Sequence, residues 1–206
     1  MNTINKHTRI YGSFSSDPGN NGSMFFNPKF EEDGINAIYK SFYSEDIRDS
    51  VFAARILNFG GFAVSMPFKT EVLKYVDEVD SVAQIIGAAN TVVNNNGHLK
   101  AYNTDWVGVF NFFKDKGLER INIIGTGGFA KAITYAFTQL GINFSIVSRK
   151  DIPTIDEVSG EYFINATPAE IKSEINTIFD ARGFTEVGKE ISKLQAEEQY
   201  KLYKNA

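Results

Sequence analysis

The chain has 206 residues, of which 43% are hydrophobic and 22% are charged, and its formal net charge is −4 at pH 7. This composition is typical of a globular protein and argues against a nucleic-acid binder, which would carry a basic face. Without cysteine the chain forms no disulfide and no thiolate metal site, and neither of its two histidines, His7 and His98, belongs to a motif described below. No metal site is therefore expected. The polar start and the lack of an apolar run of about 20 residues predict a cytoplasmic protein that does not span a membrane.

The first half of the chain alternates short β-rich runs with a helical pattern. Strands are expected at residues 8–12, 37–42 and 62–66. A helix is expected at 45–58, where apolar residues recur on one face and Ser44 is the expected N-cap. The runs 91–94 and 99–102 flank an Asn-Asn-Gly turn and predict a hairpin. We therefore expect a βαβ layer that ends in a small antiparallel edge.

The second half predicts a parallel sheet with helices. Asp105 is expected to cap a helix that ends before Gly117, because Asp favours the N-cap and Gly the helix end. A strand, a glycine turn, a helix and a second strand follow, at 120–124, 125–129, 130–140 and 143–147. Two further strands, 162–166 and 177–181, are expected in the same sheet, and a terminal helix at 187–203.

The glycine turn carries a dinucleotide-binding pattern. Gly125, Gly127 and Ala130 form Gly-x-Gly-x-x-Ala between a strand and a helix, which is the context that this fingerprint requires. The first glycine permits the tight turn, and the second lets the backbone approach a pyrophosphate at the helix N-terminus. The alternative is a plain strand–turn–helix junction. The context favours cofactor binding, with Gly128 included in the predicted site.

The end of the following strand indicates which cofactor is expected. It reads Ser148-Arg149-Lys150, with two cations where a protein that binds NAD carries an acidic residue. The planar guanidinium of Arg149 suits a phosphate group. The alternative is a solvated basic turn. The sequence favours NADP over NAD.

Three motifs precede the glycine turn, at 61–69 (GFAVSMPFK), 87–91 (GAANT) and 103–105 (NTD). Their order and content resemble the shikimate dehydrogenase family, most closely its shikimate dehydrogenase-like branch. The resemblance implies a two-domain α/β fold, in which an α/β substrate domain is followed by a truncated Rossmann-like dinucleotide-binding domain. The implied domains are a substrate-binding and catalytic domain at 1–104, an NADP-binding domain at 105–187, and a C-terminal helix at 188–206 that returns to the substrate domain.

The resemblance also implies roles for individual residues. Lys69 and Asp105 match the paired lysine and aspartate that handle the substrate proton, work that a positioned lysine can do when hydride leaves carbon. The implied substrate-binding residues are Asn20, Ser23, Ser65, Asn90, Thr104 and Gln195. The implied cofactor-binding residues are Gly125, Gly127, Gly128, Ala130, Ser148, Arg149, Lys150, Asn165 and Thr167.

The chain departs from the family pattern in two places. Residues 20–23 (NNGS) stand where the family usually has Ser-x-Ser-Pro, and resemble the Asn-x-Gly-Thr of the dehydrogenase-like branch, while Ala63 replaces a usual asparagine. Between Arg149 and Asn165 the chain is too short for the helix and strand that complete a mononucleotide-binding half, since a βαβ unit takes roughly 30 residues. We expect a sheet of about four strands, and the tyrosine of the family in this region has no clear counterpart.

The resemblance implies an NADP-dependent, shikimate 5-dehydrogenase-like oxidoreductase of aromatic amino acid biosynthesis. Its expected reaction is the reversible reduction of 3-dehydroshikimate or a related cyclic hydroxy acid. One alternative is a quinate-type dehydrogenase. The other is a non-catalytic small-molecule-binding or regulatory protein, and the shortened cofactor region favours this second alternative. The expected partner is a small-molecule substrate, not nucleic acid or membrane, and a homodimer stays open.

Overall fold

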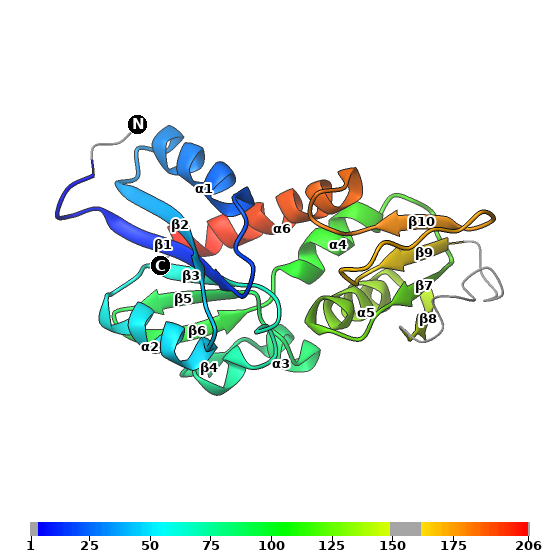
Figure 1. Ribbon diagram of the computed structural model, residues 1–206, viewed down its shortest axis with the longest axis horizontal. Coiled ribbons are helices and arrows are strands. Elements are labelled where there is room, and N and C mark those ends of the chain that lie inside the picture. The colour runs from blue at the N-terminus through cyan, green and yellow to red at the C-terminus, as the bar shows by residue number, and fades with distance from the viewer. Residues whose placement is uncertain (1–3, 149–161, 206) are drawn as a thin grey trace. The chain divides into compact units, whose positions relative to one another are not determined.

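The computed structural model describes residues 4–148 and 162–205, and it divides into two compact units. Unit 1 comprises Met1–Thr104 and Ala196–Ala206, and unit 2 comprises Asp105–Gln195. Each unit contains one β-sheet together with helices (Figure 1). The α/β class predicted from the sequence is therefore confirmed. Among the described residues, no helix combines the length and apolar character needed to cross a bilayer.

Unit 1 contains, in its described part, a six-stranded sheet in the order β2-β1-β3-β5-β6-β4. Its strands are β1 (Arg9–Ser15), β2 (Ala37–Tyr43), β3 (Gly61–Val64), β4 (Glu78–Val79), β5 (Thr91–Asn95) and β6 (His98–Tyr102). β1 pairs in parallel with β2 and β3, and β5 and β6 form the expected hairpin. β5 joins this hairpin to β3, but the predicted antiparallel edge is wrong in one respect, because the two-residue β4 pairs in parallel with β6 and is the outermost strand.

Four short helical elements accompany this sheet in the described residues. They are α1 (Asn21–Glu32), α2 (Ile47–Ile56), the 3-10 turn η1 (Val72–Lys74) and α3 (Ser81–Ile86). α2 confirms the helix expected in this region, but its N-cap is Asp46, whose carboxylate accepts the Arg48 N–H at 2.7 Å. The predicted cap, Ser44, is buried and donates its hydroxyl to the Asp46 carbonyl at 3.1 Å. The acidic side chain is the one whose oxygen reaches a free helix N–H.

The end of the last helix, α6 (Glu186–Lys204), packs inside unit 1. The ring of Tyr203 lies 4.7 Å from that of Tyr11 and 5.7 Å from that of Phe26, centroid to centroid. Gly61 leaves the space for this ring, since an added Cβ would lie 2.6 Å from Tyr203 Cε1. This aromatic cluster fixes the carboxyl end of α6 against β1 and β3.

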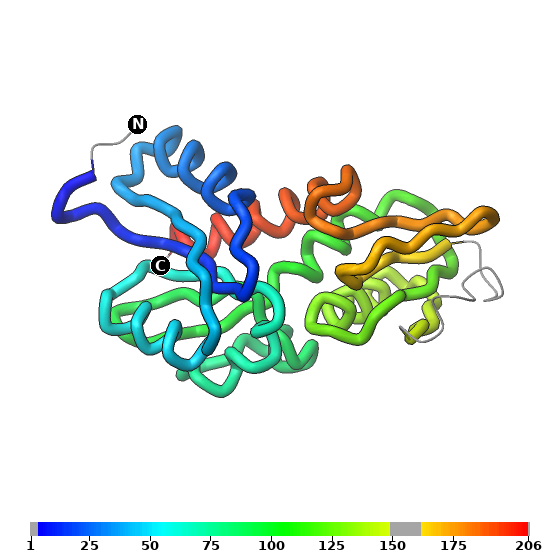
Figure 2. Tube along the Cα trace, in the orientation of Figure 1, coloured from blue at the N-terminus to red at the C-terminus, as the bar shows by residue number. Residues whose placement is uncertain are grey.

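Unit 2 contains, in its described part, a four-stranded sheet in the order β10-β9-β7-β8, and all neighbouring strands are parallel (Figure 1). Figure 2 traces the same part of the chain as a tube. Its strands are β7 (Arg120–Ile124), β8 (Asn143–Val147), β9 (Tyr162–Asn165) and β10 (Thr177–Asp180). Its other helices are α4 (Asp105–Phe113) and α5 (Gly128–Leu140). The expected sheet of about four strands is confirmed for the described residues. Asp105 is the first residue of α4 and not the residue before it, so the predicted cap is displaced by one position.

Candidate functional site

The first group of predicted residues gathers at one edge of the unit 1 sheet. β1 and β3 are parallel, so their carboxyl ends share this edge, and β5 begins there because it is antiparallel to β3. Ser65 follows β3, Asn90 precedes β5 and Thr104 follows β6. The Val64 N–H donates to the Asn90 carbonyl at 2.8 Å, which joins the first two segments. The strand pairing therefore brings together motifs that are distant in the sequence.

Asn90 and Thr104 form a buried, mutually bonded pair. The Thr104 N–H donates to Asn90 Oδ1 at 2.7 Å, and Asn90 Nδ2 donates to Thr104 Oγ1 at 3.0 Å. The Thr91 hydroxyl also donates to Asn90 Oδ1, at 3.0 Å, and Asn103 Nδ2 donates to the Ala88 carbonyl at 2.9 Å. These bonds tie the GAANT and NTD segments into one rigid element, because a satisfied buried polar network holds its members in fixed positions.

Lys69 lies in the turn that follows β3. Its carbonyl accepts the Ala89 N–H at 2.7 Å, so its backbone is held against the segment that carries Asn90. Ser65, at the start of this turn, donates its N–H to the Phe14 carbonyl at 3.0 Å and accepts the Phe68 N–H at 2.9 Å. Lys69 is half-buried and Ser65 is exposed. The structure thus brings Lys69 and Ser65 to the same edge as the Asn90–Thr104 pair.

Asn20 and Ser23 lie at the start of α1, which follows β1. The Asn20 carbonyl accepts the Met24 N–H at 3.0 Å, and its side chain makes no capping hydrogen bond. Ser23 is half-buried in the first turn. After β1 the Ser16 N–H donates to the Met66 carbonyl at 3.3 Å, so the segment that leads to α1 is bonded to the turn that carries Ser65.

Asp105 and Gln195 belong to unit 2. Asp105 is buried in the first turn of α4, where a negative charge interacts favourably with the helix dipole. One turn later, Gly108 lets α6 approach α4: an added Cβ would lie 2.7 Å from the Ile191 carbonyl oxygen and 3.0 Å from Gln195 Cβ. Gln195 is therefore held next to the helix that begins with Asp105.

The glycine turn has the backbone that a dinucleotide site needs. Gly125 has a φ of +119°, a conformation that favours glycine, and an added Cβ would lie 3.0 Å from Thr167 Cγ2. Gly127 is the exposed N-cap of α5, and no heavy atom other than those of its own local backbone and chain neighbours lies within 4 Å of the place where its Cβ would be. Gly128 is the first residue of α5, and Ala130 is buried in its first turn. This open helix N-terminus fits a pyrophosphate group.

The glycine turn also lies at the point where the strand order reverses. From β7 the chain goes to β8 on one side, and β9 and β10 lie on the other side. Open α/β sheets bind ligands outside the carboxyl ends of their strands at such a point. Gly125 follows β7 and Thr167 follows β9, so these two residues flank it. Ser148 follows β8 and is half-buried, and the predicted residues Arg149 and Lys150 lie outside the described residues.

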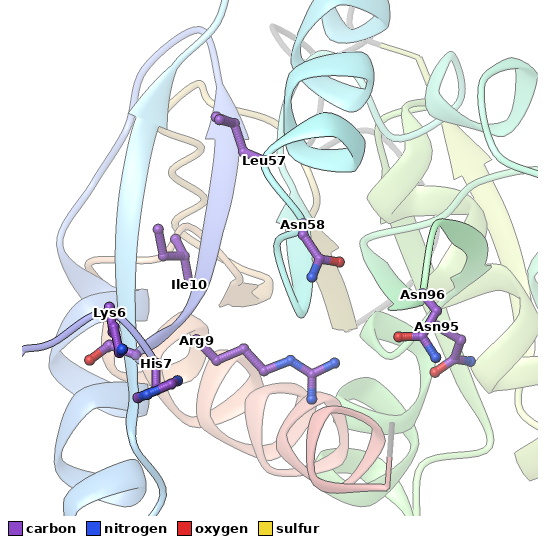
Figure 3. A pocket seen from close by; sticks show the side chains of 9 residues that line it. Lys6, His7, Arg9, Ile10, Leu57, Asn58, Asn95 and Asn96 are labelled. Atoms are coloured by element: carbon purple, nitrogen blue, oxygen red, sulfur yellow. The ribbon is translucent and has the colours of Figure 1, made fainter.

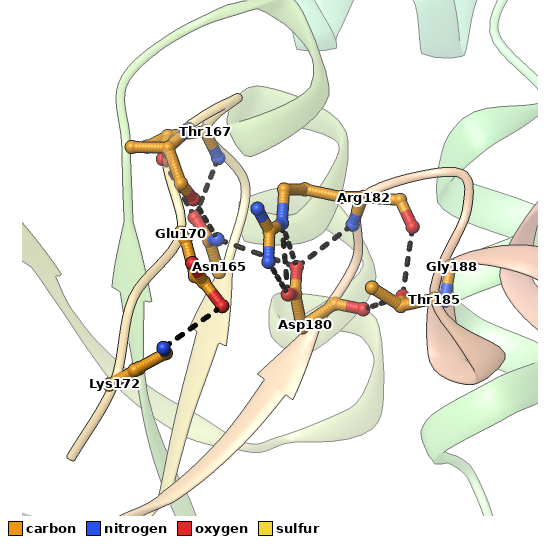
Figure 4. Close-up of polar contacts among 9 residues, drawn as sticks. Asn165, Thr167, Glu170, Lys172, Asp180, Arg182, Thr185 and Gly188 are labelled. Atoms are coloured by element: carbon orange, nitrogen blue, oxygen red, sulfur yellow. Dashed lines mark hydrogen bonds and ion pairs between the residues drawn. The ribbon is translucent and has the colours of Figure 1, made fainter.

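Asn165 shapes the loop that carries Thr167 (Figure 4). Its Oδ1 accepts the Thr167 N–H at 2.9 Å and the Thr167 hydroxyl at 2.8 Å, and its Nδ2 donates to the Ala169 carbonyl at 2.7 Å. Asn165 is completely buried, and Thr167 is nearly so. The side chain of Asn165 is thus occupied by the protein, and of the two residues it is Thr167 that touches the glycine turn.

Asp180, at the end of β10, is a polar residue that no sequence motif indicated. Its carboxylate accepts hydrogen bonds from Arg182 Nη2 at 2.6 Å and Nε at 2.9 Å. Burial alone would raise the pKa of Asp180, but the bonds from Arg182 outweigh burial and hold this pKa below its ordinary value. A depressed pKa means that the pair stabilises the fold above the pKa of unfolded Asp, and that this contribution is lost as the pH falls through the folded value.

A groove of about 730 Å³ lies at the other edge of the unit 1 sheet (Figure 3). It is lined by Lys6, His7, Thr8, Arg9, Ile10, Leu57, Asn58, Asn95 and Asn96. These residues surround the amino end of β1 and the turn between β5 and β6, so none of the predicted site residues lines the groove. No cluster of three or more His, Cys, Asp or Glu suited to a metal ion occurs in residues 4–148 and 162–205.

Comparison with known proteins identifies relatives of this chain. Residues 22–92 match the shikimate dehydrogenase substrate binding domain. A shikimate dehydrogenase (NADP(+)) of Sulfolobus acidocaldarius is 31% identical over 193 residues, which cover 82% of this chain and 71% of that protein. A shikimate dehydrogenase-like protein of Haemophilus influenzae is 37% identical over 154 residues, 73% of this chain. The chain spans about half the length of several such relatives, 57% of the Haemophilus protein among them.

The fold has a counterpart among solved structures. A shikimate 5-dehydrogenase-like protein matches with a TM-score of 0.79 and 28% identity, over 99% of this chain and 94% of that chain. This match confirms the predicted combination of a substrate domain with a Rossmann-like domain. Together with the identity to the Sulfolobus enzyme, it shows that the chain belongs to the shikimate dehydrogenase family.

Proposed function

We propose that this chain is a shikimate dehydrogenase-like oxidoreductase that uses NADP(H) to reduce 3-dehydroshikimate, or a related cyclic hydroxy acid, reversibly. The observation that carries the proposal is the meeting of Lys69, Asn90 and Thr104 at one edge of the unit 1 sheet. These residues come from three separate motifs, and a chain that only needed to fold would have little use for a lysine held beside a rigid amide–hydroxyl pair. Membership of the family and relatives named as NADP(+)-dependent support the reaction and the cofactor.

Oxidation of an alcohol removes a hydroxyl proton together with a hydride from carbon. In the proposal Lys69 accepts the proton, and Asp105, which follows Thr104 directly in the chain, is the second catalytic residue. The rigid Asn90–Thr104 pair, with Ser65 and Gln195, orients the ring hydroxyls of the substrate. Asn20 and Ser23, at the N-terminus of α1, bind its carboxylate, which the positive end of a helix favours.

The residues around the glycine turn fit a dinucleotide cofactor. The positive φ of Gly125 and the open space beside Gly127 suit the close approach of a pyrophosphate at the N-terminus of α5. Gly128 and Ala130 would complete this part of the site, and Asn165 would support Thr167 at its side. In the proposal Ser148, Arg149 and Lys150 bind the 2′-phosphate. NADP(H), when bound, supplies the hydride acceptor or donor.

Turnover with paired substrates tests the proposal against its alternatives. The purified protein is incubated with NADP⁺ and either shikimate or quinate, and NADPH formation is followed by its absorbance. NADPH formation from shikimate supports the proposal, and turnover of quinate alone would assign a quinate-type dehydrogenase. Cofactor or substrate binding without turnover of either alcohol would favour the non-catalytic alternative.

Arg149→Ala is expected to weaken NADPH binding about tenfold, or about 1.4 kcal/mol, and NADH binding much less. The reason is the basic end of the strand: an Arg fork can pair with a 2′-phosphate, which NADH lacks. Fluorescence titration of wild type and variant with each cofactor measures this, with Lys172→Ala as a control at an exposed lysine of unit 2. Equal losses for both cofactors would assign Arg149 a structural role, and tighter binding of NADH by the wild type would contradict the choice of NADP.

A further inference from the structure

We propose that Asp180 is a positioning residue of the cofactor site, which holds the loop 165–169 against the glycine turn through Asn165. The proposal rests on the proposed NADP(H) function and extends it to a residue outside every motif. Its basis is a set of contacts within unit 2 that runs from Asp180 on β10 through Asn165 on β9 to Thr167 (Figure 4), whose methyl group lies beside the glycine turn after β7.

The contacts begin with the register of the sheet. Asp180 stands directly opposite Asn165 in the β9–β10 ladder, and Asn165 Nδ2 donates to Asp180 Oδ1 at 3.4 Å. Asn165 in turn accepts both the N–H and the hydroxyl of Thr167. The Thr167 methyl carbon, Cγ2, lies where a Cβ on Gly125 would be 3.0 Å away. The side chains of Asn165 and Asp180 therefore set the position of Thr167 beside the glycine turn.

The carboxylate of Asp180 is itself held in one orientation. Arg182 binds it through Nη2, Nε and the backbone N–H, with the last bond 3.2 Å long to Oδ1. The side chains of Arg182 and Asp180 are only 15% and 21% exposed. Partly buried, charge-assisted bonds of this kind are strong and fix geometry. The carboxylate can thus serve as a rigid anchor for the Asn165 amide.

The backbone on the other side of Asp180 is anchored independently. The Thr185 hydroxyl donates to the carbonyls of Asp180 and Arg182, and it accepts the Gly188 N–H at 3.0 Å, which caps α6. Position 188 accommodates only glycine, because a Cβ there would overlap the Arg182 carbonyl. A change confined to the Asp180 carboxylate should therefore leave the start of α6 in place and loosen only the connection to Asn165.

Asp180→Asn tests the proposal, because loss of the charge and loss of the positioning contact should change the affinity for NADPH in opposite directions. Removing a negative charge near an anionic cofactor removes a Coulomb repulsion, which alone should strengthen binding. If Asp180 positions the loop, NADPH binding should instead weaken about tenfold, because an amide cannot both keep the Arg182 fork and accept from Asn165 in the same way. The Kd for NADPH is measured by fluorescence titration well below the unfolding temperature.

The matched control is Glu170→Gln, which removes the same charge from the same part of the chain. Glu170 pairs with Lys172 at 3.4 Å, but these side chains are 60% and 81% exposed, and exposed pairs contribute little. We expect its Kd to stay within about twofold of wild type. An equal loss of affinity in Glu170→Gln and Asp180→Asn would overturn the positioning role.

Two further measurements separate positioning from general stability. Phe137→Leu, in the buried core of unit 2, should lower the unfolding temperature and leave the Kd for NADPH unchanged. Amide hydrogen exchange at Thr167 and Ala169 should accelerate at least about tenfold in Asp180→Asn and in neither control. Unchanged exchange in Asp180→Asn would refute the proposal. If wild type binds no NADPH, the proposed function fails, and the exchange measurement alone decides whether Asp180 orders the loop.

Discussion

Replacing Lys69 by alanine is expected to lower kcat for shikimate oxidation by on the order of 10²–10⁴-fold, the usual contribution of a general acid–base group. The backbone of Lys69 is fixed by its bond to Ala89, and its half-buried side chain is not part of the buried hydrophobic clusters. The variant should therefore keep the circular dichroism spectrum and nearly the unfolding temperature of wild type. Steady-state kinetics with NADP⁺ and shikimate measure the loss.

Two further variants separate loss of the proton-transfer group from loss of a positive charge. Lys74→Ala removes an exposed lysine from η1, five residues further along, and should retain activity within about twofold of wild type. Lys69→Arg keeps the positive charge but supplies no base, because a guanidinium is not deprotonated in proteins, so it should be nearly as impaired as the alanine variant. A rate for Lys69→Ala within about tenfold of wild type would contradict the assignment of Lys69 as the proton-transfer group.

The elements of unit 2 could be predicted because local signals agree there with the tertiary structure. Gly125 at φ +119° and Gly141 at φ +69° end a strand and a helix where the sequence suggested, and apolar runs mark the parallel strands. In unit 1, β4 escaped prediction because it has two residues and exists only by pairing with β6. α3 carried a readable signal: Asp80 accepts the Val82 N–H at 3.0 Å as N-cap, and Gly87 ends the helix in the left-handed conformation.

The sequence motifs predicted which residues belong to the candidate site, but not how the fold brings them together. Lys69, Asn90 and Thr104 were identified by resemblance to a family, and their proximity follows from the antiparallel pairing of β5, which no single motif encodes. The link between Asp180 and Asn165 depends on the register of β9 and β10, which no motif in the sequence indicates. The motifs could therefore indicate the residues proposed to contact ligands, but not the residues that hold those side chains in position.

The cofactor affinity is expected to be the property in which this chain differs most from its longer relatives. β8 is the outermost strand of the described sheet beside β7, and Ile146 on it is 54% exposed. A complete doubly wound half places one more strand beyond this position, next to the pocket for the adenosine moiety. Only residues 148–161 separate β8 from β9 in the sequence, whereas a complete βαβ unit takes roughly 30 residues.

We therefore expect NADPH to bind about a hundredfold more weakly than to a full-length shikimate dehydrogenase. If the pocket lacks one wall and about 100 Å² of apolar cofactor surface therefore stays in water, the loss is about 2.5 kcal/mol at roughly 25 cal/mol per Å², and about 1.4 kcal/mol corresponds to tenfold in Kd. Calorimetric titration beside a full-length relative measures the difference. Shikimate affinity serves as the internal control, because Lys69, Asn90 and Thr104 belong to unit 1, whereas the short segment between β8 and β9 belongs to unit 2. Equal NADPH affinity would mean that another part of the protein rebuilds the pocket, and no binding at saturating NADPH would favour the non-catalytic alternative.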